Sequence, residues 1–180
     1  VILSGKNLAQ VLSYYTEKSA ADMIYPGYSS WKKRDGVQGE IKGDALDLTV
    51  VATRPFSDDG IRMNALTVIE DGKLQAIHGS TPFCRYLGIE PTGTFDKTKC
   101  GNQGSVSFDD MKKTPCLWAV AFSDFQMDTF SGHFGGEIRL AYLIEDGKVT
   151  PVTGGSINGN LIEAQRNMTF TKERFVSANY

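Results

Sequence analysis

Histidine is scarce in this sequence, and its two copies do not form a helical zinc motif. His78 and His133 are 55 positions apart in the chain. A motif of the H-E-x-x-H type needs two histidines one helical turn apart, so that both imidazoles can reach one ion, and a glutamate as base. Neither histidine here is followed by a glutamate at that offset. We therefore expect no metal ligands and no catalytic residue on this chain.

Cysteine and long apolar runs are also scarce. Cys84, Cys100 and Cys116 are odd in number and show no C-x-x-C spacing, which favours reduced thiols over a disulfide framework. No apolar run approaches the ~20 residues of a membrane helix, and no signal-sequence pattern is present. These absences predict a cytoplasmic protein that makes no membrane contact.

The charge pattern excludes another class of function. The 19 basic and 21 acidic residues are spread along the chain and give a net charge of -2. Binding to nucleic acid needs a basic stripe, and the one basic triplet, Lys32-Lys33-Arg34, is better explained as a solvated turn. We expect no direct contact with nucleic acid. A length of 180 residues predicts a single domain, residues 1–180.

Two similar hairpins are the clearest local signal in the chain. Glu70-Asp71-Gly72-Lys73 and Glu145-Asp146-Gly147-Lys148 each stand between two apolar runs. Asp followed by Gly is typical of a two-residue hairpin turn, because both positions must adopt φ > 0. The repetition favours a sheet that closes on itself with approximate internal symmetry, although a common turn can also recur by coincidence.

Other segments predict a mixture of helices and strands. Residues 7–18 and 82–87 have the spacing and the flanking residues of helices, and the second one is followed by Gly88, suited to an αL position. Alternation over residues 46–53 and the apolar run 117–122 indicate strands. Together they predict an α+β fold with a curled antiparallel sheet, or pseudo β-barrel, capped by helices.

Several ordered elements resemble one known family. The resemblance covers most of residues 58–160 and is carried by Asp58-Asp59-Gly60, Leu66 to Leu74, Tyr86-Leu87-Gly88, Glu90-Pro91-Thr92-Gly93, the second hairpin with the loop before it, and Gly154 to Asn160. In order and spacing these are similar to the carboxy-terminal domain of the TldD/PmbA proteins, long labelled modulators of DNA gyrase and understood as zinc-dependent peptidases. The chain departs from the family pattern between Thr94 and Pro115.

This resemblance implies a function that depends on residues outside the chain. In the family, an H-E-x-x-x-H helix in an amino-terminal domain holds the zinc, and a cysteine near the carboxy terminus completes the site in the TldD branch. Neither is found here, since the last cysteine is Cys116. The resemblance thus implies that this chain is the carboxy-terminal part, without the metal-motif domain and inactive by itself, of a peptidase whose full-length form uses zinc.

The best candidate site is the glycine-rich segment before the second hairpin. It consists of Ser131, Gly132, His133, Phe134, Gly135 and Gly136. Glycine lets a ligand approach the backbone closely, so we expect these residues to lie in a loop that contacts a peptide substrate. The alternative is a solvent-facing loop without a binding role, in which His133 contacts no ligand.

Two functions from different classes remain open. The first is that the chain forms the substrate cleft of a zinc-dependent peptidase that acts on peptides or unfolded proteins. The second is a non-catalytic module, like the PmbA branch, that binds an extended peptide by strand addition or mediates dimerisation. Either way the expected partners are a peptide and a family member, in a homo- or heterodimer.

Overall fold

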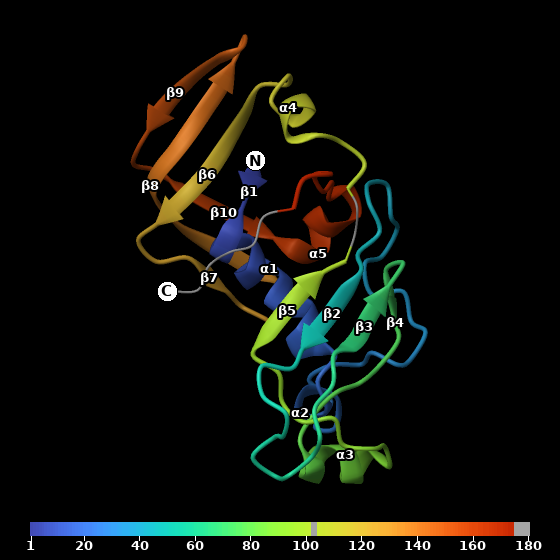
Figure 1. Ribbon diagram of the computed structural model, residues 1–180. Coiled ribbons are helices and arrows are strands. Elements are labelled where there is room, and N and C mark those ends of the chain that lie inside the picture. The colour runs from blue at the N-terminus through green and yellow to red at the C-terminus, as the bar shows by residue number, and fades with distance from the viewer. Residues whose placement is uncertain (102–103, 175–180) are drawn as a thin grey trace. The chain divides into compact units, whose positions relative to one another are not determined.

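The computed structural model describes residues 1–101 and 104–174 and divides them into two compact units (Figure 1). Among the described residues, unit 1 contains residues 1–12, 42–44 and 104–174, and unit 2 contains residues 13–41 and 45–101. The assignment of residues 1–180 to a single domain stays a prediction. Within the described residues, no helix has the length and apolar character needed to cross a bilayer.

Unit 1 is built around a six-stranded curled sheet that forms a half-barrel. Its strands are β1 (Ile2–Leu3), β6 (Cys116–Phe122), β7 (Gln126–Met127), β8 (His133–Glu145), β9 (Lys148–Val152) and β10 (Ser156–Asn160). The long strand β8 pairs antiparallel with four of them, and β1 runs parallel to β6. The short helices α4 (Phe108–Met111) and α5 (Leu161–Ala164) and the 3₁₀ turn η1 (Gln165–Asn167) complete the unit.

The core of unit 1 lies on one face of this sheet. Ala119, Ile138 and Ala141 are buried there, and Phe122 and Ile157 pack against them. The helix α1 (Gly5–Lys18), which the sequence predicts over residues 7–18, contributes its first half to this unit. Exposure along β8 is uneven, because His133, Glu137 and Arg139 are open to solvent, whereas Tyr142 packs against Trp118.

Unit 2 contains a four-stranded antiparallel sheet in the order β4-β3-β2-β5. The elements are α2 (Ala21–Ile24), β2 (Leu48–Val51), β3 (Leu66–Glu70), β4 (Lys73–Leu74), α3 (Thr81–Leu87) and β5 (Lys97–Cys100). Leu46, Leu48 and Val50 are buried, as their alternation predicts. The fold is therefore α+β with a curled sheet, which confirms the predicted class.

Both predicted hairpins are present, but they do not belong to one sheet. The turn residues Asp71, Gly72, Asp146 and Gly147 all have positive φ, between 49° and 74°. The first turn joins β3 to β4 in the four-stranded sheet, and the second joins β8 to β9 in the six-stranded sheet. The expectation that the two hairpins close a single sheet is therefore wrong, since each unit has a sheet of its own.

The predicted loop over residues 131–136 is largely a strand. β8 begins at His133, so the loop ends at Gly132. Gly135 pairs with Gln126 of β7 on one side and with Asn158 of β10 on the other. Two partner strands fix the glycine backbone in extended form, and their pairing with β8 joins segments that lie apart in the sequence.

Candidate functional site

A shallow groove lies over the first part of β8 on the solvent face of the unit 1 sheet. It consists of two adjoining hollows of about 300 and 500 Å³, and both are lined by Gln126, Gly135 and Asn158. These three residues stand side by side on β7, β8 and β10. We call the combined feature the Gly135 groove.

Polar side chains surround this groove because three strands present their solvent faces together. Asp124, Gln126 and Asp128 alternate along the β7 segment, and Ser156 and Asn158 alternate along β10. His133 and Glu137 belong to the same face of β8. The groove thus offers carboxylates and amides, with glycine at its centre.

At one end of the groove, three side chains form a hydrogen-bonded chain. The Ser131 hydroxyl donates to Asp128 Oδ2, and Ser131 Oγ is 3.0 Å from His133 Nδ1. The hydroxyl has one proton and gives it to the carboxylate, so Nδ1 of His133 must be the donor in the second bond. The Ser131 hydroxyl and the Phe130 amide hold the pKa of Asp128 below its usual range, so it is ionised at neutral pH.

Four of the six residues predicted as a site line the groove. They are His133, Phe134, Gly135 and Gly136. Ser131 does not line it but positions His133, and Gly132 is buried with φ of 80° in the preceding turn.

Sequence reasoning missed the residues from β7 and β10. The signal was present as alternation of polar residues in Asp124-x-Gln126-x-Asp128 and Ser156-x-Asn158-x-Asn160. Such alternation is typical of a strand with one solvated face. What could not be inferred is that both segments flank Gly135, because this pairing joins residues far apart in the sequence.

The space beside the two central glycines is filled by the chain itself. A Cβ at Gly135 would lie 2.5 Å from Asn158 Oδ1 and 2.8 Å from the carbonyl oxygen of Ile157. At Gly136 it would lie 2.7 Å from the carbonyl oxygen of Asp124. These glycines therefore allow the strands to pack closely, and a substitution here acts on the fold before it acts on a ligand.

The outer edge of β10 carries main-chain groups directed away from the sheet. The amide of Leu161 donates to Gly132, and the amide of Ile138 donates to Gly155. Since bonded and non-bonded pairs alternate in an antiparallel ladder, Ile157 and Gly159 must bond to β8. The N–H and C=O groups of the alternate residues, Ser156, Asn158 and Asn160, then point outward. Among the described residues, no main-chain bond to these outward groups is found.

The other edges of this sheet are less open. On the β7 side, Gln10 donates to the carbonyl oxygen of Phe125 at 2.6 Å. β9 carries Pro151, which has no N–H, at an outward position of its edge. β1 has only two residues. Since proline and coverage by other elements protect sheet edges from pairing, β10 is the edge best suited to accept another strand.

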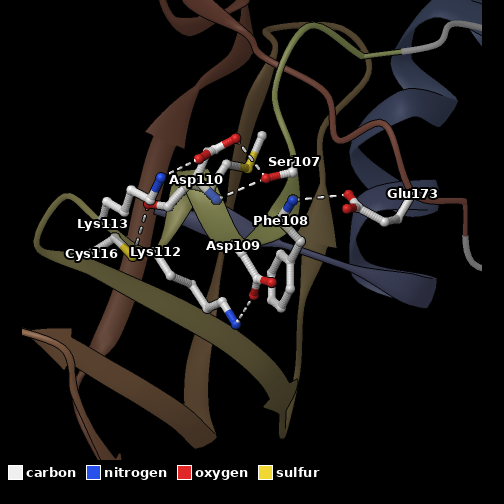
Figure 2. A network of polar contacts seen from close by, with 9 residues as sticks. Ser107, Phe108, Asp109, Asp110, Lys112, Lys113, Cys116 and Glu173 are labelled. Atoms are coloured by element: carbon white, nitrogen blue, oxygen red, sulfur yellow. Dashed lines mark hydrogen bonds and ion pairs between the residues drawn. The ribbon is translucent and has the colours of Figure 1, made fainter.

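The segment that departs from the family pattern, residues 94–115, includes a network of polar contacts around α4, which Glu173 joins from outside the segment. Figure 2 shows Ser107 at the N-cap, where its Oγ accepts from the Asp110 amide at 3.0 Å. Lys113 bonds to Asp110 and, together with Ser107, lowers the pKa of that carboxyl to about 2. Glu173 accepts from the Phe108 amide at 2.8 Å. Asp109 forms an ion pair with Lys112, and Asp110 bonds to the N-cap residue and to Lys113, so this acidic pair is structural.

The chain belongs to the family described as the PmbA/TldA metallopeptidase C-terminal domain, which matches residues 1–178. This confirms the family resemblance seen in the sequence. It is 27% identical over 134 residues to the "Metalloprotease TldD homolog" of Haemophilus influenzae, covering 66% of this chain and 28% of the relative. It is 25% identical over 185 residues to a "Metalloprotease" of Methanothermobacter thermautotrophicus, covering 92% of this chain and 40% of that protein.

A solved structure shows the same fold. A Thermotoga maritima protein, named as a modulator of a DNA gyrase, matches 92% of this chain and 42% of its own chain. The TM-score is 0.71 at 19% sequence identity, so the likeness concerns the fold alone. The chain thus spans well under half the length of the relatives that it matches.

The metal that the family name implies does not fit the residues of this chain. In residues 1–101 and 104–174, no three His, Cys, Asp or Glu side chains are grouped so that they could hold a metal ion. His78 is buried, and its Nε2 is 2.9 Å from the Thr16 carbonyl oxygen, to which it must donate. His133 donates Nδ1 to Ser131.

Proposed function

We propose that this chain is the substrate-holding part of a zinc-dependent peptidase that acts on peptides or unfolded proteins. The family is one of metallopeptidases, and the chain corresponds to 28–40% of the length of its metalloprotease relatives. The zinc and its base would come from protein outside this chain. The chain itself would hold the peptide in extended form.

The observation that carries this proposal is the outward edge of β10 beside the Gly135 groove. An extended peptide can add to a sheet edge through main-chain hydrogen bonds alone, which suits substrates of varied sequence. Outward groups from Ser156, Asn158 and Asn160 would supply these bonds. Asn158 also lines both hollows of the groove, so side chains of an added strand would reach them.

The test is a pair of substitutions at one position. Asn158→Pro removes an outward N–H that takes no part in the ladder with β8, so it should leave the sheet intact and weaken peptide binding. Asn158→Ala keeps the N–H and should bind nearly as well as the wild type. Binding is measured by fluorescence anisotropy with a labelled, acetylated nine-residue peptide of alternating Thr and Val around a central Gln.

Hydrogen exchange gives a second measurement on the same complex. The amides of Ser156, Asn158 and Asn160 should exchange fast in the free chain and slowly with peptide bound. Those of Ile157 and Gly159 are bonded within the sheet and serve as internal controls. Equal peptide affinity of the folded Asn158→Pro variant, or unchanged exchange at the outward amides, would contradict strand addition at β10.

A second candidate is a non-catalytic module that binds peptide as a partner subunit of a catalytic family member. The lack of any cysteine in residues 117–180 fits this function, and it equally fits a piece of a catalytic protein. The metal content of the full-length protein separates the two functions. One zinc per subunit supports the peptidase, and a metal-free protein that still binds the Thr-Val peptide supports the partner subunit.

A further inference from the structure

We infer that the outer edge of β10 selects peptides that carry a large apolar residue opposite Gly159. This inference rests on the proposed function, because it assumes an extended peptide on that edge. It adds the chemical class of the preferred substrate. The occupant is one stretch of extended peptide, and the ring of Phe134 is the surface that its apolar side chain contacts.

The ring of Phe134 takes the place of the side chain that Gly159 lacks. The two residues are directly opposite each other in the ladder between β8 and β10. A Cβ at Gly159 would lie 2.6 Å from Phe134 Cζ, 3.0 Å from Cε1 and 3.2 Å from Cε2. The tip of the ring therefore lies over β10, although the backbone of Phe134 belongs to β8. In this way a glycine on an edge strand presents an aromatic surface.

Other apolar residues support this ring on the side away from β10. Phe125 is 8% exposed, and its ring centroid is 6.2 Å from that of Phe134. Met127 of β7 is the ladder partner of Phe134 on that side. Phe134 itself is half-buried and lines the hollow of about 300 Å³ together with Met127 and Gly159. The ring is therefore held by the core and accessible beside Gly159.

A peptide side chain opposite Gly159 is within reach of the ring. A strand added to β10 is its direct neighbour, only one strand spacing of ~4.8 Å away. Since Gly159 bonds to β8, its partner on an antiparallel peptide forms a non-hydrogen-bonded pair, in which the side chains are closest. Cβ atoms of directly opposite residues are ~4.5–5.5 Å apart. Because the ring tip lies at the Cβ position of Gly159, a leucine or phenylalanine of the peptide can cover this gap.

The residues around Gly159 favour an apolar side chain over a polar one. Ile157 is on the same face of β10, since side chains alternate along a strand, and it packs against the core of unit 1. The other face of β10 carries Ser156, Asn158 and Asn160, which are uncharged. An apolar side chain would be removed from water by the ring and Ile157, which is favourable. A charged or amide group there would lose hydrogen bonds to water without gaining a partner.

The experiment uses a second labelled, acetylated nine-residue peptide, the Thr-Gln series, in which Thr and Gln alternate around a central Phe, Leu, Gln or Lys. Dissociation constants are measured by anisotropy in ~50 mM and ~500 mM NaCl. We expect the Phe and Leu peptides to bind about fivefold more tightly than the Gln peptide, the upper range for a cross-strand pair. The Lys peptide should bind no more tightly than Gln. Salt should not weaken the apolar preference, because no ion pair contributes to it.

Matched variants locate the effect. Phe134→Leu shortens the side chain over Gly159 with a smaller loss of core volume than alanine would bring, and should remove most of the preference for Phe over Gln. Phe130→Leu makes the same exchange at a side chain that is 59% exposed in the turn before β8, and should leave the preference intact.

A measurement on the wild-type chain does not depend on the folding of a variant. In its complex with the Leu peptide, the leucine methyl groups should show nuclear Overhauser contacts with the ring protons of Phe134. The Gln peptide is the control, because its central residue has no methyl group.

Each outcome has a distinct meaning. The apolar selection is wrong if the four central residues bind equally well, if Phe134→Leu keeps the full preference, or if the leucine methyl groups do not contact Phe134. It is also wrong if the Thr-Val host peptide binds and no peptide of the Thr-Gln series does. In each of these cases the proposed function stands as long as the Thr-Val host peptide binds. If no peptide binds at all, the proposed function itself is overturned and this inference with it.

Discussion

Gly135 and Gly136, the two central glycines of β8, do not have the role that the sequence predicts for them. The sequence indicates glycines that make room for a ligand, but the room is occupied by the strands on both sides. A Cβ at Gly136 would lie 2.7 Å from the Asp124 carbonyl oxygen and 2.9 Å from Phe125 Cα. Both contacts are with backbone, which cannot move aside as a flexible side chain can.

Gly136→Ala should therefore destabilise unit 1, by ~1–3 kcal/mol as in other overpacked sites. Gly36→Ala is the matched control, since a Cβ there meets no atom within 4 Å and its φ is not in the left-handed range. The control should stay within ~0.5 kcal/mol of the wild type. Urea denaturation compares the free energies of unfolding. Equal stability of the two variants would show that β7 can move away from β8 at no cost.

His78 makes the stability of unit 2 depend on pH. It is 7% exposed, Nδ1 has no partner among the described residues, and burial lowers its pKa from the usual ~6.5. Below pH ~6.5, His78 takes up a proton in the unfolded chain but stays neutral in the folded chain. The free energy of unfolding therefore decreases as the pH is lowered. Above that pH the contribution is complete. Asp22 is the nearby charge that opposes this shift.

Urea denaturation at pH 7.5 and 5.5 checks this expectation. The wild type should be less stable at pH 5.5, and His78→Gln should lose much of that difference, because glutamine does not titrate. A pH dependence that persists in His78→Gln would assign the effect to other groups.

Among the elements, the two Asp-Gly turns have the same backbone and different surroundings. Gly72 has φ of 67°, and a Cβ there would lie 2.6 Å from Ile41 Cδ1 and 3.2 Å from Gln38 Oε1. Gly147 has φ of 74° and open space around it. Gln38 is buried and accepts from the Leu46 amide, so its carbonyl oxygen is not free to move.

Gly147→Ala should therefore cost ~1–2 kcal/mol from the left-handed backbone alone, and Gly72→Ala should cost more. The measurement is the urea midpoint of each variant. Asp146→Asn is a control at the same turn, because asparagine tolerates the positive φ of this position and the midpoint should change little. Equal losses for both glycine variants would mean that Ile41 and Gln38 adjust without penalty.

How much of each element was predictable depends on whether its signal is local. α1, α3, β2 and both hairpins follow from periodicity, capping residues and turn chemistry within a few positions of the chain. β10 does not, because Ser156-Ile-Asn-Gly-Asn160 contains residues that are depleted in strands and is held in place by β8. The groove needs β7, β8 and β10 together, so only its glycine-rich strand could be found from the sequence.

At the scale of the whole molecule, membership of a metallopeptidase family and possession of a metal site are two separate properties. Membership of a metallopeptidase family follows from residues 1–178 as a set. The metal, however, needs a few side chains in contact, and this chain does not bring them together in its described part. The segments 102–103 and 175–180 contain no His, Cys, Asp or Glu in their sequence, so every side chain with a preferred zinc donor lies in the described part.

The isolated chain should therefore retain no stoichiometric zinc and cleave no peptide, although it should bind the Thr-Val host peptide. Of its two histidines, His78 is buried with Nε2 bonded to Thr16, and His133 belongs to no group of three such side chains in the described part of the chain. Protein loaded with zinc and then dialysed is assayed by mass spectrometry for metal and by fluorescence for peptide cleavage. His133→Ala is the control, because loss of zinc in that variant would trace any binding to the groove. One zinc per wild-type chain after dialysis would show that this chain, and not protein outside it, supplies the metal site.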